Sequence, residues 1–238
     1  GDVQNGIGTD GVHLYRPGTR QWTLPTVAGV FEERLFHASV YDPLHDVIWV
    51  TGGIGRCGLA DIAANRCSAR PLATKYLRFD PATGDATWME LGGSGGPTTV
   101  YGHIMVFDPV GKRLIAIGGT RDGRQGSNDA WQLDLSDADP ANARWSDLPT
   151  LGVSLPRVAL HAGALDAAHG WIVVYGGVSS NFNTPNENTS TATFALDLAQ
   201  NPPVWANLGA SLQQRIGAAL ETNTAKPGGR AKAFCVPA

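Results

Sequence analysis

The sequence predicts an all-β protein assembled from repeated four-stranded antiparallel units. Three observations support this prediction: a glycine pair ends each of three apolar runs, a similar block of residues precedes each run, and a tryptophan follows downstream in each unit. The glycine pairs are Gly52-Gly53, Gly118-Gly119 and Gly176-Gly177. A set of markers that recurs in the same order indicates one supersecondary unit copied along the chain.

Each unit divides into four predicted strands, which we name a to d. Strand a is predicted by the block before the glycine pair: HASVYDP from His37, HIMVFDP from His103 and HAGALDA from His161. A short polar segment joins this block to the apolar run of strand b, as in a β-hairpin. Strand c ends near an aspartate: Asp80, Asp134 and Asp197. Strand d carries the tryptophan: Trp88, Trp145 and Trp205.

Three units can be followed nearly from end to end, over residues 36–91, 103–148 and 161–208. Residues 12–24 look like strands c and d of a preceding unit, and residues 216–236 look like strands a and b of a following one. A unit with two apolar faces is not stable alone, but radial stacking against further copies buries both faces. Residues 1–238 are therefore predicted to form a single β-propeller domain, or part of one, with each unit a blade.

The order of glycine pair, aromatic or acidic strand and tryptophan resembles the kelch family, of the bacterial or fungal extracellular type, over about residues 36–209. Kelch-like propellers are expected to have about six or seven blades. The resemblance therefore implies that three complete blades and two half-blades form part of a larger propeller. A closed propeller of about four blades, in which the two half-blades combine, is the alternative.

The composition argues against several classes of function. Charged residues make up 16% of the chain and the formal net charge is −3, which favours neither nucleic acid nor an anionic membrane. Apolar residues make up 42%, enough for a substantial core, yet no apolar stretch is long enough for a membrane span. We therefore expect no nucleic-acid partner and no membrane span.

The expected location is extracellular or the cell surface, where two cysteines and one asparagine could be modified. Cys57 and Cys67 lie in one predicted loop and can close it as a disulfide, with two unpaired loop thiols as the alternative. Asn188 begins an Asn-Thr-Ser sequence, which is a glycosylation acceptor. The first residues of the chain carry no signal-peptide pattern.

The long b-to-c and d-to-a connections of a propeller emerge on one common edge of the blades, which we call the loop face. Binding residues concentrate on such loops, and arginines with aromatic side chains suit an acidic peptide, a glycan or a carboxylated small molecule. Ordinary solvated loops are the alternative. The candidate ligand-binding residues are Arg34, Arg56, Tyr101, Arg121, Arg124, Arg157, Asn181 and Phe182.

Metal binding is a weaker interpretation of two other patterns. His37, His103 and His161 begin the innermost strands and could face a central channel, but a residue repeated in every blade is better explained by packing between blades. Asp122, Asn128 and Asp129 share one loop, but their spacing fits turn formation better than calcium coordination.

The sequence carries no catalytic motif that we can assign, so the predicted function is a non-catalytic binding or scaffold module. Its partner is expected to be a protein or a glycan held at the loop face, without a cofactor. The kelch resemblance also leaves open an extracellular enzyme, either copper radical oxidase-like or sugar epimerase-like. A third possibility is a structural subunit of a surface assembly, in which partner subunits cover the open blade edges.

Overall fold

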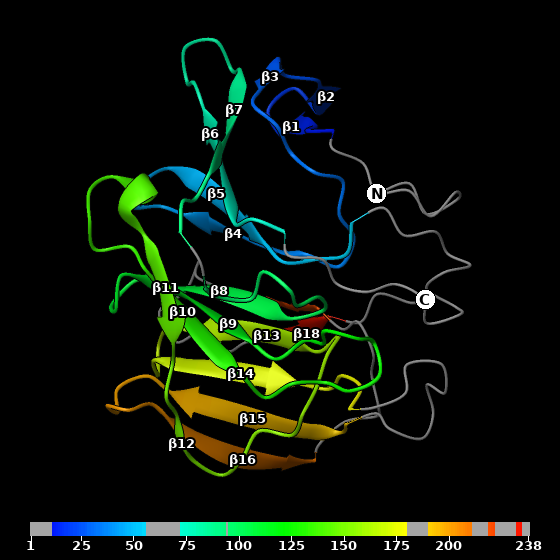
Figure 1. Cartoon of the computed structure of the whole chain (residues 1–238), viewed down its shortest axis with the longest axis vertical. Helices are drawn as coiled ribbons and strands as arrows, with labels where there is room; N and C mark the ends of the chain where they lie inside the picture. The colour runs from blue at the N-terminus through cyan, green and yellow to red at the C-terminus, as the bar shows by residue number, and fades with distance from the viewer. Residues whose placement is uncertain are drawn as a thin grey trace.

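The structure is a computed structural model that describes residues 11–55, 72–93, 95–179, 190–210, 219–221 and 232–234. It is all-β, with a single short 3-10 helix at Pro140–Asn142 in the described ranges. Three larger sheets follow one another along the longest axis of the molecule (Figure 1). We call them the first, second and third units, in chain order.

Each unit contains four antiparallel strands that pair in chain order. The first unit consists of β4 (Ala38–Asp42), β5 (Val47–Thr51), β6 (Lys75–Phe79) and β7 (Ala86–Glu90). The second consists of β8 (Ile104–Asp108), β9 (Arg113–Ile117), β10 (Ala130–Asp134) and β11 (Arg144–Asp147). The third consists of β13 (Ala162–Asp166), β14 (Trp171–Tyr175), β15 (Ala192–Asp197) and β16 (Val204–Ala210).

The first and third units each gain a fifth strand that the repeat does not predict. β3 (Val27–Ala28) pairs in parallel with β7, and β12 (Leu151–Gly152) pairs in parallel with β16. Both segments belong to the connection that enters the unit. The incoming chain thus covers the outer edge of the sheet, where unpaired backbone groups would otherwise be exposed.

Two separate hairpins flank the three units. β1 (Leu14–Arg16) pairs with β2 (Gln21–Thr23), and β17 (Ala219–Glu221) pairs with β18 (Lys232–Phe234), both antiparallel. These four strands fall where the sequence predicts the halves of two further units. Among the described strands, the two hairpins belong to different sheets and do not pair with each other.

The hydrophobic core lies between the units. The cluster between the first and second units includes Trp49, Tyr76, Met105 and Leu133. The cluster between the second and third units includes Ile115, Ile117, Val158, Ile172 and Phe194. The first strands of successive units also contact one another in series, from β4 to β8 to β13 to β17. Stacked antiparallel sheets that meet at their first strands are consistent with a propeller-like fold.

The described part of the chain has no helix of the length and apolar character needed to cross a membrane.

Candidate functional site

The histidine that precedes strand a packs between the glycine pairs of two adjacent units. A Cβ atom added to Gly52 of the first unit would come within 2.6 Å of His103 Cε1 in the second. His161 lies in the same way against Gly118 of the second unit, again at 2.6 Å from the added Cβ. Only glycine allows this approach, because any side chain would occupy the space that the imidazole ring fills.

Both of these histidines are buried, and neither ring has a hydrogen-bond partner among the described residues. Burial lowers the pKa of His103 to about 3, and the charges of His161 and His37 act in the same direction. Burial also lowers the pKa of His161 to about 4; the Ile117 carbonyl opposes this shift, although it does not meet the ring with hydrogen-bond geometry. The rings are therefore neutral at pH 7 and act as packing groups.

His37 begins the first unit, and its environment differs because no glycine pair of a preceding unit lies against it in the described part of the chain. The residue as a whole is exposed, although partial burial of its ring lowers its pKa. Among the described residues, no group of three or more His, Cys, Asp or Glu side chains is arranged to hold a metal ion.

The tryptophan of each strand d has a structural role as well. A glycine in the connection that enters the unit lies against the tryptophan backbone or ring, and each of these glycines has a positive φ. The pairs are Gly29 with Trp88, Gly96 with Trp145, and Gly152 with Trp205. His103, His161 and the repeated glycines and tryptophans are thus used to assemble the units, which leaves the loops that differ between units as candidates for binding.

A depression of about 240 Å³ opens on the loop face beside the second unit. It is formed by the loop between β9 and β10 together with the connection that enters the third unit. Its walls carry two arginines, two aspartates and several neutral polar groups: Arg121, Asp122, Gln125, Gly126, Ser127, Asn128, Asp129 and Arg157. The charged side chains at this depression come from both sides of a boundary between two units.

Backbone hydrogen bonds hold the loop of the depression against the third unit. The Gly126 N–H donates to the Ser179 carbonyl at 2.9 Å, and the Val158 N–H donates to the Ser127 carbonyl at 3.0 Å. A Cβ added to Gly126 would come within 2.6 Å of the Val158 nitrogen, so this glycine is needed for the close approach. A loop fixed in this way loses little further conformational freedom when a ligand binds.

Asp122 fixes the other end of the same loop. Its Oδ1 accepts the backbone N–H groups of Arg124 at 2.8 Å and Gln125 at 3.2 Å. Burial tends to raise the pKa of Asp122, but these hydrogen bonds outweigh it and hold the pKa below its usual value. Asp122 is thus an ionised turn-forming residue, as the turn interpretation of the sequence predicts.

Arg121 and Arg157 point their charged groups to solvent at the depression. The Arg121 guanidinium lies 3.7 Å from the Asp129 carboxylate. The Arg121 side chain is 58% exposed and the Asp129 side chain is 50% exposed. Arg157 is exposed and donates a long hydrogen bond of 3.5 Å to Gln125 Oε1. Exposed pairs of this kind are weak, so a ligand can replace them at little cost.

Tyr101, a candidate ligand-binding residue, lies beneath the surface. It is 8% exposed, and its backbone pairs with that of Thr120. Burial and the nearby charge of Asp122 raise its pKa to about 12. Among the described residues of this region, Phe36 is an exposed aromatic group; it lies 6.4 Å from the Tyr101 ring and is not among the residues that the sequence suggested. Its signal in the sequence is weak, because the residue before the repeated histidine is a large apolar one in only two of the units, Phe36 and Leu160.

Arg34, another candidate, is buried in the first unit. Its guanidinium donates to the Gly52 and Ala73 carbonyls and to Glu32, and it lies 4.6 Å from the centre of the Phe31 ring. Because its side chain has no exposed surface, it is not available to a ligand in this structure. We interpret Arg34 as a structural residue.

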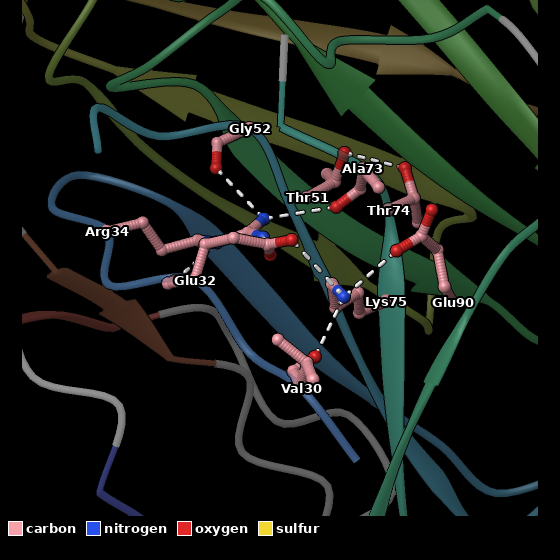
Figure 2. A network of polar contacts seen from close by, with 9 residues as sticks. All are labelled: Val30, Glu32, Arg34, Thr51, Gly52, Ala73, Thr74, Lys75 and Glu90. Carbon is pink, nitrogen blue, oxygen red and sulfur yellow. Dashed lines mark hydrogen bonds and ion pairs between the residues drawn. The ribbon is translucent and has the colours of Figure 1, made fainter. Parts of the chain in front are cut away.

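A second buried cation, Lys75, lies in the same polar network (Figure 2). Its Nζ donates to the Val30 carbonyl at 2.7 Å and to Glu90 at 3.0 Å, and it lies 3.4 Å from Glu32. The register of the strands gives Lys75 the position that aromatic residues hold in the second and third units, Trp131 and Phe194. The first unit therefore replaces an apolar contact by a network of paired charges.

The remaining candidates are divided between the depression and the part of the chain outside the described residues. Arg124 is exposed on the loop of the depression but does not line it. Six predicted residues lie outside the described residues: Arg56, Cys57, Cys67, Asn181, Phe182 and Asn188. The structure therefore brings together Arg121 and Arg157 and adds Asp129, whose place in the sequence suggested only a metal ligand or a turn former.

Comparison with known proteins supports the fold and carries no functional assignment. No family model matches the chain, and no curated protein matches it either. Among solved structures, that of YjhT aligns over 94% of this chain and 71% of its own, with a TM-score of 0.62 and 18% sequence identity. A likeness at this level of identity concerns the fold alone.

Proposed function

We propose that the three units are blades of a kelch-type β-propeller that acts as a non-catalytic binding module. The equivalent histidine-glycine and tryptophan-glycine contacts support this, as does the series of contacts between first strands. The hairpins β1–β2 and β17–β18 then belong to two further blades of a propeller of about six or seven.

The ligand we propose is a glycan that carries carboxylate groups, bound in the depression on the loop face. The observation that carries this proposal is a pair of exposed guanidinium groups beside acceptor groups. Arg121 lies on the β9–β10 loop, which backbone hydrogen bonds hold in place, and Arg157 lies on the connection that enters the third unit. Guanidinium groups bind carboxylates through charge-assisted and often bidentate hydrogen bonds. The carboxylate and amide oxygens of Asp129 and Asn128 can accept hydrogen bonds from sugar hydroxyls.

The mixed charge of the depression favours an acidic glycan over an acidic peptide. Asp122 and Asp129 lie among the same lining residues as the two arginines, so the net charge of these four side chains is zero. A polyanionic peptide would meet repulsion from both aspartates. A glycan with spaced carboxylates can pair each one with an arginine while its hydroxyl groups contact the aspartates.

The experiment is an equilibrium binding measurement with oligogalacturonate and its methyl ester, which differ in the charge of the carboxyl groups. Wild-type protein should bind the acid at least about tenfold more tightly than the ester, which corresponds to roughly 1.4 kcal/mol. The double substitution Arg121→Ala and Arg157→Ala should remove this preference. Its melting temperature should stay within about 2 °C of wild type, since exposed side chains contribute little to stability.

Arg78→Ala is the matched control, because Arg78 is an exposed arginine on β6, outside the depression. This variant should bind the acid as wild type does. Equal affinity of the Arg121→Ala, Arg157→Ala protein and wild type would contradict the proposal. A preference for an acidic peptide, such as oligoglutamate, over oligogalacturonate would contradict the choice of a glycan.

A further inference from the structure

A second cavity, of about 250 Å³, lies on the edge of the sheets opposite the loop face. We call this edge, where the short a-to-b and c-to-d turns lie, the turn face. One wall is the β8–β9 turn of the second unit, and the other belongs to the third unit. Most of the lining is apolar, from Pro109, Val110, Leu165, Ala167, Leu198 and Ala199, and the polar side chains are those of Asp108 and Arg113.

The equivalent place between the first and second units is filled by a side chain of the protein itself. His45, on the β4–β5 turn, places Nδ1 2.6 Å from Asp42 Oδ2 and Nε2 2.8 Å from the Asp137 carbonyl of the second unit. The side chain is 5% exposed. A planar ring with a donor group therefore bridges the first and second units on the turn face.

The second unit has the same turn, but the aspartate of this turn binds a different side chain. Asp108 Oδ1 accepts the Val110 N–H, as Asp42 Oδ1 accepts the Leu44 N–H. Gly111 stands where His45 stands in the first unit, and Arg113 stands where Val47 does. Arg113 Nε donates to Asp108 Oδ2 at 2.9 Å, so it takes the partner that the imidazole has in the first unit.

The glycine at position 111 is required by this arrangement. A Cβ atom added there would come within 2.5 Å of Asp108 Oδ2 and 2.7 Å of Arg113 Nε. A side chain at position 111 therefore cannot fill the cavity while the Asp108–Arg113 pair is in place. The carboxylate already has a cationic partner, so a group that enters the cavity does not need a positive charge.

The backbone of the third unit beside the cavity resembles the backbone of the second unit beside His45. The Leu198 N–H donates to the Gly170 carbonyl, as the Leu135 N–H donates to the Lys112 carbonyl. Asp197 Oδ1 also accepts the Ala199 N–H, as Asp134 Oδ1 accepts the Ser136 N–H. The backbone that follows Leu198 thus repeats the start of the turn whose Asp137 carbonyl contacts His45.

We propose that this cavity on the turn face binds a small neutral heteroaromatic ligand, a planar ring that carries one N–H donor. The apolar walls contact the two faces of the ring. The ligand N–H donates to the backbone of the third unit, as His45 Nε2 donates to the backbone of the second. The guanidinium of Arg113, which is planar, offers a surface for stacking with the ring. This site is distinct from the depression on the loop face and does not depend on the glycan proposal.

Indole and 1-methylindole test the proposal, because they share a planar shape and differ in the N–H donor. Binding to the whole chain is followed by NMR titration or calorimetry. Indole should bind, and 1-methylindole should bind at least about fivefold more weakly, which corresponds to roughly 1 kcal/mol. The double substitution Gly111→His and Arg113→Val recreates the residues of the first unit and should weaken indole binding more than tenfold.

Ala167→Leu, at an exposed lining position, gives a second way to fill the cavity if the double variant does not fold. The Arg121→Ala, Arg157→Ala protein should bind indole as wild type does, which separates this site from the loop face. The proposal is overturned if wild type does not bind indole, if indole and 1-methylindole bind equally, or if binding survives in the filled variants that fold.

Discussion

Gly118 and His161 form a contact between two units that depends on the absence of a side chain. A Cβ atom on Gly118 would lie 2.6 Å from His161 Cε1 and 2.8 Å from the Val158 carbonyl oxygen. The Gly119 N–H beside it donates to that same carbonyl at 2.8 Å. Gly52, Gly53 and His103 repeat this arrangement between the first and second units, where the Gly53 N–H donates to the Val100 carbonyl at 2.9 Å.

The first prediction concerns pH, because His103 and His161 are buried without hydrogen-bond partners among the described residues. Their folded pKa values, about 3 and about 4, lie below the ordinary value of 6.5. The unfolded chain therefore binds more protons below pH 6.5, so stability is full above that pH and falls as the pH decreases toward 4. Between pH 7 and pH 5 we expect a loss of roughly 2 kcal/mol for each histidine.

Urea unfolding of wild type and of the His103→Gln, His161→Gln protein at pH 7 and pH 5 checks this prediction. The double variant should be less stable at pH 7, since the glutamine side chains do not reproduce the ring contacts. It should nevertheless lose clearly less stability than wild type between the two pH values. If both proteins lost the same stability between pH 7 and pH 5, groups other than these two histidines would be responsible for the pH dependence.

The second prediction concerns Glu32, which contacts both buried cations of the first unit. Its carboxylate lies 2.8 Å from Arg34 Nη2 and 3.4 Å from Lys75 Nζ. Glu32→Gln leaves the fully buried Arg34 without its anionic partner, and we expect a loss of about 1–3 kcal/mol. The loss stays below that of a fully buried pair because the Glu32 side chain is 42% exposed.

Glu90→Gln is the matched control for this prediction. Glu90 is more exposed, and without its charge Lys75 keeps the Val30 carbonyl and Glu32 as partners. Its loss should be below about 1 kcal/mol, as for surface ion pairs. Chemical unfolding at pH 7 would refute our interpretation of the network if Glu90→Gln proved more destabilising than Glu32→Gln.

The third prediction concerns Phe36, whose φ of +55° lies in the left-handed region that favours glycine. Gly102 has the equivalent position in the second unit, with φ of +66°, and Leu160 has it in the third, with φ of +54°. Backbone strain of this kind costs about 1–3 kcal/mol. Because the Phe36 ring is 45% exposed, Phe36→Gly should leave stability unchanged or raise it by up to about 1 kcal/mol.

Leu160→Gly provides the comparison. The Leu160 side chain packs toward Gly102 of the second unit, so its removal also removes an apolar contact. Thermal unfolding should therefore show a lower melting temperature for Leu160→Gly than for Phe36→Gly. The reverse order would show that packing of the Phe36 ring, not backbone strain, dominates at this position.

Much of the scaffold could be predicted from the repeated residues. Apolar runs that end in a glycine pair specify strand b, and the spacing to the next aspartate and tryptophan places strands c and d. The packing role expected for the repeated histidines agrees with where His103 and His161 lie. The short strands β3 and β12 could not be predicted, because two residues that pair only through their backbone leave no pattern in the sequence.

The burial of Arg34, a candidate site residue, was harder to predict because burial of charged residues depends on tertiary partners. Arginine and lysine are usually surface residues, so the sequence does not predict burial of Arg34 and Lys75. Their positions correspond to Val100 and Trp131 of the second unit. Only the carboxylate and carbonyl groups that face them explain their burial. The cavity on the turn face does have a signal in the sequence. When the three a-to-b turns are aligned, Gly111 has the position that histidine has in the other two, His45 and His169.

The unfolding free energies of Gly118→Ala and Gly170→Ala test most directly whether glycines in the repeat accept the side chains of the next unit. Both positions have similar positive φ values, +70° and +68°, but no atom lies within 4 Å of a Cβ added to Gly170. Each alanine carries the backbone strain, and only Gly118→Ala meets His161 and Val158. We predict that Gly118→Ala is more destabilising by about 2 kcal/mol or more. Equal losses would show that the contact with His161 does not require glycine at position 118.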